Sequence, residues 1–174
     1  MGSVRLTILR LALAGIGLLP PGASALAQAG SHLALSVAAG PSPYDLSGTG
    51  TGFAAAMQLS WRPVSGLVIE PGLTYFTYES QFSERIHYLM NELSVQGELP
   101  LGQVRPFLGG GAGFARVVSD ADENDIVATL HAVGGFRVDL SPTWGGRAEM
   151  RVRAVRPWTG NTVDFLFGFS RMLQ

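Results

Sequence analysis

Charged side chains recur at every second residue in several parts of the chain, most clearly at Arg147, Glu149, Arg151 and Arg153. In an extended strand, residues two apart lie on the same face, so these four side chains would share one surface. Over the whole chain that face carries six Arg and six carboxylates. Buried charges must be paired, and Arg suits close pairing with carboxylates. We therefore predict an interior charge network made of Arg62, Glu70, Glu92, Glu98, Arg105, Arg137, Asp139, Arg147, Glu149, Arg151, Arg153 and Asp164.

Other chemistry finds little support in the residue spacing. His32, His87 and His131 have no H-x-x-x-H spacing and no neighbouring ligand cluster. The Gly-rich stretches 48–52 and 109–113 carry no G-K-[ST] and do not lead from a strand into a helix, so they are not phosphate loops. We predict no catalytic, cofactor-binding or metal site, and no enzyme activity.

The acidic segment 119–125 is the one concentrated charge cluster. Alternating acids can ligate calcium, but the glycine and the final glutamate of a calcium loop are replaced here by Asp125 and His131. A solvated acidic loop is the favoured interpretation, and a divalent-cation site stays open.

Composition narrows the class of protein. Only 14% of the 174 residues are charged, against about 25% in a typical soluble domain. The net charge of -1 and the absence of a basic block argue against a nucleic-acid partner. Zero cysteines exclude a disulfide framework and thiol catalysis.

The N-terminus has the features of a secretory signal peptide. Arg5 and Arg10 precede the apolar run Leu11 to Leu19, which is too short to span a bilayer, and residues 25–27 read A-L-A, a cleavage site. We predict a signal peptide at 1–27, a mature domain at 28–174, and export from the cytoplasm.

The mature chain alternates apolar and polar residues in eight runs, each bounded by turn-forming residues. Each run has roughly the ten residues of a tilted strand across a bilayer. The runs cover residues 32–40, 53–62, 67–78, 89–99, 104–115, 128–140, 147–154 and 162–173. Tight turns at 63–66, 99–103 and 141–145 alternate with longer connections near 42–51, 79–85, 119–125 and 156–161. The prediction is an all-β fold, an eight-stranded antiparallel up-and-down transmembrane β-barrel.

Three observations predict that the apolar face points outward into lipid. The polar face mixes long charged residues with glycines, as a narrow lumen requires; its charges balance; and the apolar face is almost free of charge. Aromatic residues toward the strand ends would form interfacial girdles. The predicted girdle residues are Trp61, Tyr75, Phe114, Phe136, Trp144, Trp158, Phe165 and Phe169.

The stretches RPFLGGGAGF at 105–114, GGFRVDLSP at 134–142 and RAEMRVR at 147–153 resemble the small outer-membrane β-barrels typified by OmpA, OmpX and OmpW. The resemblance implies insertion by the barrel assembly machinery, contact with outer-membrane lipid and lipopolysaccharide, and a monomer. In that family the last strand ends in an aromatic residue. Here Leu173 stands near that place, and Phe169 is the nearest outward aromatic residue.

The expected function is a non-enzymatic outer-membrane barrel with a charge-plugged lumen, in envelope integrity or surface interaction. Two alternatives stay open: an OmpW-like conduit for small apolar molecules, and a soluble periplasmic ligand-binding barrel.

Overall fold

The computed structural model describes residues 32–43, 51–79, 85–119, 124–155 and 160–173. The expected signal peptide at 1–27, the cleavage point, Trp158 and most of the acidic segment 119–125 lie outside these ranges. Within the part of the chain that the structure describes, no helix is long and apolar enough to cross a membrane. The strands are β1 (His32–Pro43), β2 (Thr51–Val64), β3 (Leu67–Glu79), β4 (Arg85–Glu98), β5 (Val104–Ser119), β6 (Asn124–Asp139), β7 (Trp144–Val155) and β8 (Gly160–Leu173).

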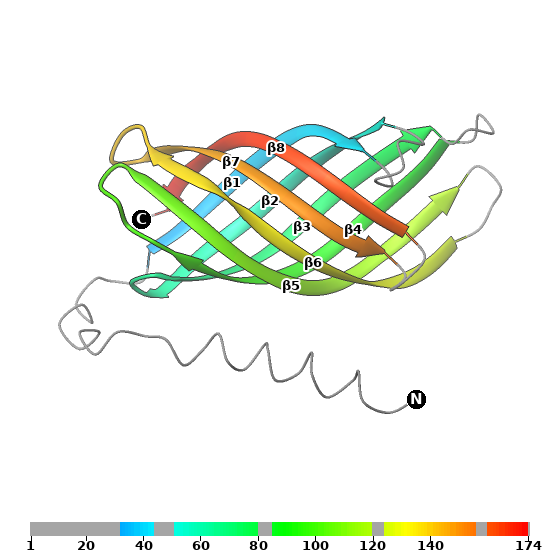
Figure 1. Ribbon diagram of the computed structural model, residues 1–174, viewed down its shortest axis with the longest axis horizontal. Helices are drawn as coiled ribbons and strands as arrows, with labels where there is room; N and C mark the ends of the chain where they lie inside the picture. Colours follow the sequence, from blue (N-terminus) through cyan, green and yellow to red (C-terminus); the bar gives the residue numbers. More distant parts are fainter. Residues whose placement is uncertain (1–31, 44–50, 80–84, 120–123, 156–159, 174) are drawn as a thin grey trace, which may run out of the picture.

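The eight strands form a closed barrel in which every strand pairs antiparallel with its neighbours in the chain. β1 and β8 close the ring, from Leu33 opposite Leu173 to Ala39 opposite Phe167. Figure 1 shows the strands tilted across the long axis, with the three short turns at one end. The predicted eight-stranded up-and-down barrel is confirmed.

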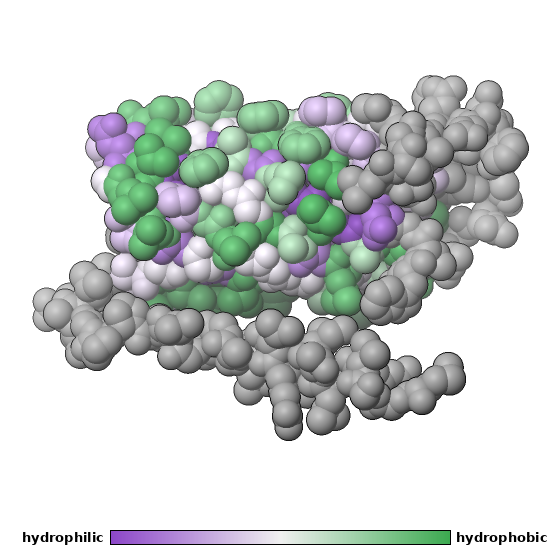
Figure 2. All heavy atoms as spheres, viewed as in Figure 1, coloured by the Kyte–Doolittle hydropathy of each residue, from purple (hydrophilic) through white to green (hydrophobic). Residues whose placement is uncertain are grey.

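Alternation along each strand divides side chains between the lumen and the outer face. On β7, Arg147, Glu149, Arg151 and Arg153 are at most 4% exposed, while Val152 between them is 40% exposed. Figure 2 shows apolar residues spread over the visible outer face of the barrel. Along the described strands, most charged side chains therefore lie inside the barrel, and most large apolar side chains lie outside.

The turns are tighter and the strands longer than the sequence pattern predicted. β2 and β3 are joined by Ser65 and Gly66 alone, and Gly66 has a φ of 82°, a left-handed value that glycine adopts without strain. Gly102, with a φ of 68°, has the same role between β4 and β5. Trp144, which was expected in a turn, is the first residue of β7 because it pairs with Arg171 of β8.

The seam between β1 and β8 differs from the other strand pairs. Its ladder stops at Ala39, just before Pro41 and Pro43, because proline has no N–H to donate. The two strands nevertheless stay together: a Cβ added at Gly40 would clash with the carbonyl oxygen of Phe165. Beyond Ala39, toward the end with the long connections, β1 and β8 are therefore closely packed but share fewer backbone hydrogen bonds.

Glycines on the lumen face of β5 allow neighbouring groups to approach closely. A Cβ at Gly111 would clash with the backbone of Leu93 on β4 and lie 2.8 Å from His131 Cε1. The sequence pattern predicted that these glycines make room for large lumen side chains. In the structure, the nearest group to the space that a Cβ at Gly111 would occupy is the backbone of the adjacent strand β4.

Candidate functional site: the charged lumen

The lumen is filled in layers, beginning at the end with the short turns. Glu98 accepts hydrogen bonds from Arg62 Nε at 3.2 Å and from Arg137 Nη1 at 2.7 Å. Arg105 Nη1 lies 3.7 Å from Glu98 and also pairs closely with Asp139 at the rim, whose side chain is 44% exposed. This mouth layer draws its charges from β2, β4, β5 and β6.

The middle layer is centred on Glu70 of β3. Arg147 donates to both carboxylate oxygens of Glu70, each at 2.7 Å, in the bidentate geometry that Arg and carboxylates favour. Arg137 Nη2 donates to the same carboxylate at 3.1 Å, and Ser60 at 2.5 Å. Arg147 also pairs with Glu149. Both carboxylate oxygens of Glu70 therefore accept hydrogen bonds from the protein, which replace those that water cannot make to a side chain that is 1% exposed.

Phe107 packs beneath this layer. The Arg137 guanidinium carbon lies 4.0 Å and that of Arg147 5.1 Å from the centre of its ring. A cation over a ring face is attracted to it, most strongly when desolvated. The two arginines are therefore held between carboxylates and an aromatic ring.

The upper layer is built around Glu92 of β4. Arg153 donates to it from Nε at 2.7 Å and Nη2 at 2.8 Å, and Arg151 Nη1 donates at 3.1 Å. Arg153 also pairs with Asp164 of β8. His131 Nδ1 lies 3.2 Å from Glu92, and its Nε2 lies 2.7 Å from Ser94 Oγ.

The twelve charges form one continuous network in which positive and negative groups alternate. It runs from Asp139 through the mouth and middle layers to Asp164, and Arg62 branches from Glu98. β7 supplies three of its six cations, and their carboxylate partners include Glu70 and Glu92 on β3 and β4. Because β3 and β4 lie across an eight-stranded ring from β7, these ion pairs span the lumen.

Above the network the lumen becomes apolar, toward the end with the long connections. A cluster of buried side chains fills it, and Tyr78, which packs against this cluster, stacks on both Phe76 and Tyr88. The buried members are Ala38, Ala54, Ala56, Phe76, Tyr88, Met90, Ala115, Val127, Val155 and Leu166. The interior thus has a charged half and an apolar half.

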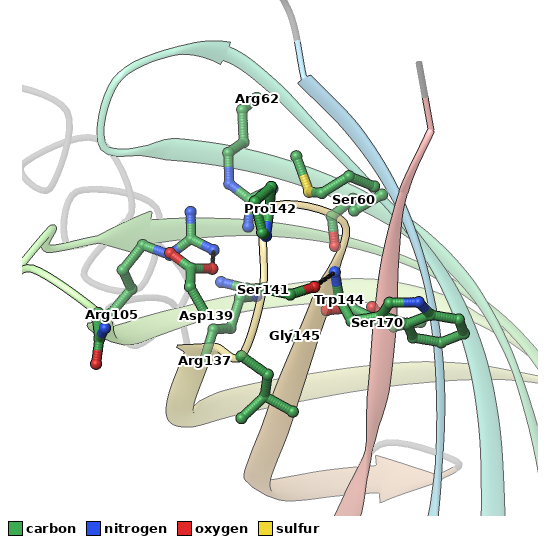
Figure 3. Close-up of a pocket in the computed structure, with 15 residues that line it drawn as sticks. Ser60, Arg62, Arg105, Arg137, Asp139, Ser141, Pro142, Trp144, Gly145 and Ser170 are labelled. Carbon is green, nitrogen blue, oxygen red and sulfur yellow. Dashed lines mark hydrogen bonds and ion pairs between the residues drawn. The ribbon is translucent and has the colours of Figure 1, made fainter.

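A cavity of about 450 Å³ opens at the turn end, below the mouth layer. Figure 3 shows Arg62, Arg105 and Asp139 directed toward one another there, with Pro142 of the turn between β6 and β7 beside them. Trp144 N donates to Ser141 Oγ at 3.0 Å and fixes this turn. Arg62, Arg105 and Arg137 of the mouth layer form part of its lining.

All twelve residues of the predicted network lie on the lumen side, and each pairs with at least one other member. Sequence reasoning put neutral side chains on the same face but gave them no part in the network. Gln96 donates to Glu70 at 2.9 Å, and Gln58 donates to Glu149 at 3.1 Å. The same alternation could have found them, since both are polar at lumen positions.

The predicted girdle residues that the structure describes all lie on the outer face, between 39% and 64% exposed. Trp61, Phe136, Trp144 and Phe169 lie nearer the turn end of their strands; Tyr75, Phe114 and Phe165 lie nearer the other end. Arg171 lies 5.8 Å over the ring of Trp144. Among the described residues, no group of three or more His, Asp or Glu side chains could hold a metal ion.

Comparison with models of known protein families finds no match. Comparison with curated protein sequences finds none either. Among solved structures, Neisserial surface protein A is 16% identical with a TM-score of 0.65, covering 82% of this chain and 99% of its own. The chain has the fold of the small outer-membrane β-barrels.

Two further structures support this identification of the fold. A major outer membrane protein of Thermus thermophilus has a TM-score of 0.59 at 12% identity and covers 83% of this chain and 100% of its own. The outer membrane protein OprG of Pseudomonas aeruginosa has a TM-score of 0.55 at 13% identity and covers 84% and 97%. The resemblance inferred from the sequence is confirmed at the level of the fold.

Proposed function

We propose that the protein is a non-enzymatic β-barrel of the outer membrane, exported by a cleaved signal peptide, with a structural or surface-interaction role. The observation that carries the proposal is the inverted distribution of polarity. A continuous ion-pair network closes the lumen, and large apolar side chains such as Leu108, Phe167 and Phe169 are 60 to 73% exposed outside.

Energetics favour lipid as the medium around this outer face. Monomeric proteins in water rarely expose apolar patches beyond a few hundred square ångströms. A ring of exposed apolar residues on all eight strands exceeds that, and in a bilayer the same surface carries no penalty. The paired backbone groups of a closed barrel also meet the requirement that no strand edge face lipid.

The lumen network suits a structural role better than a pore. Twelve charged side chains and their amide and hydroxyl partners occupy the section that a solute would cross. An eight-stranded barrel is only wide enough for side chains to fill it. We accordingly propose a monomer that inserts through the barrel assembly machinery and contacts outer-membrane lipid and lipopolysaccharide.

Fractionation of cells producing the full chain tests the proposal. The protein should remain in the outer-membrane fraction after a carbonate wash, require detergent for release, and begin at Gln28 when its N-terminus is sequenced. A folded barrel should also migrate differently on gels before and after boiling. Recovery from the periplasm without detergent would establish the soluble ligand-binding alternative instead.

The apolar half of the lumen favours a second candidate, a conduit for small apolar molecules. Phe76, Tyr88 and Met90 are buried members of the apolar cluster in this half of the lumen. Because the charged half blocks the way through, a solute would have to leave sideways, past the weakly bonded seam beyond Ala39. Binding of an apolar fluorescent probe that Met90→Arg abolishes would support this candidate, and no binding would reject it.

A further inference from the structure

The outer face carries an apolar groove of about 490 Å³. Its floor is formed by Ala39 of β1 and Ala55 of β2, which are direct partners in the strand register. Ala39 also pairs with Phe167, and Ala55 pairs with Tyr75. Two small side chains therefore lie between two rings in one row across the sheet, and this difference in size creates the groove.

A small polar cluster borders the groove on its β3 side. Tyr75 Oη lies 2.7 Å from His87 Nδ1, and the two rings are stacked with centres 5.9 Å apart. Leu89 pairs with both Tyr75 and Arg116, so exposed Arg116 projects from the same outer face one strand farther on. His87 and Arg116 are diagonal neighbours, a spacing that long side chains can bridge.

The cluster is placed where a lipid head group would meet the barrel. Tyr75, His87 and Arg116 lie toward the end with the long connections, which faces the cell exterior in outer-membrane barrels. Tyr side chains favour the boundary between acyl chains and head groups. Arg is well suited to bind phosphate oxygens, and the ring nitrogen of His87 that does not contact Tyr75 can provide a second polar contact.

We propose that the groove and this cluster together bind lipopolysaccharide through its lipid A anchor. An acyl chain lies over Ala39 and Ala55, and a phosphate of the head group is bound by Arg116 and His87, with Tyr75 positioning His87. The inference rests on the proposed outer-membrane location. It adds a defined site, in the outer leaflet, for one class of lipid.

Native mass spectrometry of the full chain tests the site. The protein is reconstituted into phosphatidylcholine nanodiscs that contain either lipid A or phosphatidylglycerol, and lipid retained after release into detergent is measured. Wild type should retain lipid A in preference to phosphatidylglycerol. Arg116→Ala should retain about tenfold less, the effect of losing one hydrogen bond to a charged group. Ala55→Phe, which fills the groove, should lower retention similarly.

Matched controls use the same outer face elsewhere. Ala132→Phe adds the same ring on β6, and Arg171→Ala removes an outer-face cation at the turn end, so both should retain lipid A like wild type. Equal retention of both lipids, equal loss in test and control variants, or a dimer mass in place of a lipid adduct would overturn the site. A barrel that fractionates with the outer membrane yet gives any of these results refutes this inference and leaves the proposed function standing.

Discussion

The four glutamates of the lumen each bridge at least two arginines, whereas the aspartates end the network at Asp139 and Asp164. This sharing matters because a buried charge is stabilised only while its partners stay in place. Glu70 is the extreme case: 1% exposed, and hydrogen-bonded to two arginines, a serine and a glutamine.

Replacing Glu70 by Ala should therefore destabilise the folded barrel by about 3 to 5 kcal/mol, since it leaves Arg137 and Arg147 buried without their shared carboxylate. Asp139→Ala is the control, because Asp139 is 44% exposed and an exposed ion pair contributes at most about 1 kcal/mol. Urea titration of the refolded proteins in lipid vesicles measures both free energies of unfolding. Similar values for the two variants would contradict the structural role assigned to the network.

For individual residues, the sequence predicted which charged side chains belong to the lumen network, but it did not predict which of them pair with one another. Period-two spacing was enough to assign the charges to one face, because successive side chains of a strand point to opposite sides. The partner of each charge depends on the register of strands that are distant in the chain. Glu70 and Arg147, for example, are 77 residues apart.

The strands contribute unequally to the charge network of the lumen, and β7 contributes the largest share. It contributes Arg147, Arg151 and Arg153, whose partners on β3 and β4 lie across the ring. Strand existence was predictable from alternation. Strand ends were less so, because backbone pairing continues beyond the apolar section: β5 and β6 reach 16 residues, and β7 begins at Trp144.

A double-mutant cycle between β4 and β7 measures one cross-lumen connection. Glu92→Ala and Arg153→Ala should show a coupling energy of about 1 to 3 kcal/mol, because the two side chains share two hydrogen bonds of 2.7 and 2.8 Å. A second cycle pairs Glu92 with Arg62, which bonds Glu98 in another layer, and should be additive to within about 0.5 kcal/mol. Additivity in both cycles would mean that the cross-lumen pairs do not stabilise the barrel.

On the scale of the whole molecule, the 14% of charged residues that set the chain apart from soluble domains has a structural explanation. Nearly half of the charges usually found in a soluble domain are unnecessary if the outer face meets lipid, and most of those that remain along the described strands lie inside. Fold and polarity were thus predictable from the sequence. The outer-face groove was not, because it depends on Ala39, Ala55 and Phe167 meeting across three strands.

The chain has no cysteine, so a single introduced cysteine carries a spin label at one known site. Labels at Leu130 and Ala132 would report the outer face of β6, and a label at Val133, which is 1% exposed, would report its lumen face. In lipid vesicles, collision with oxygen reports contact with acyl chains, and collision with a water-soluble nickel complex reports contact with water. The account predicts high oxygen and low nickel accessibility at 130 and 132, and low accessibility to both at 133. High nickel accessibility at 130 and 132 would contradict an apolar face in lipid around a closed, charged interior.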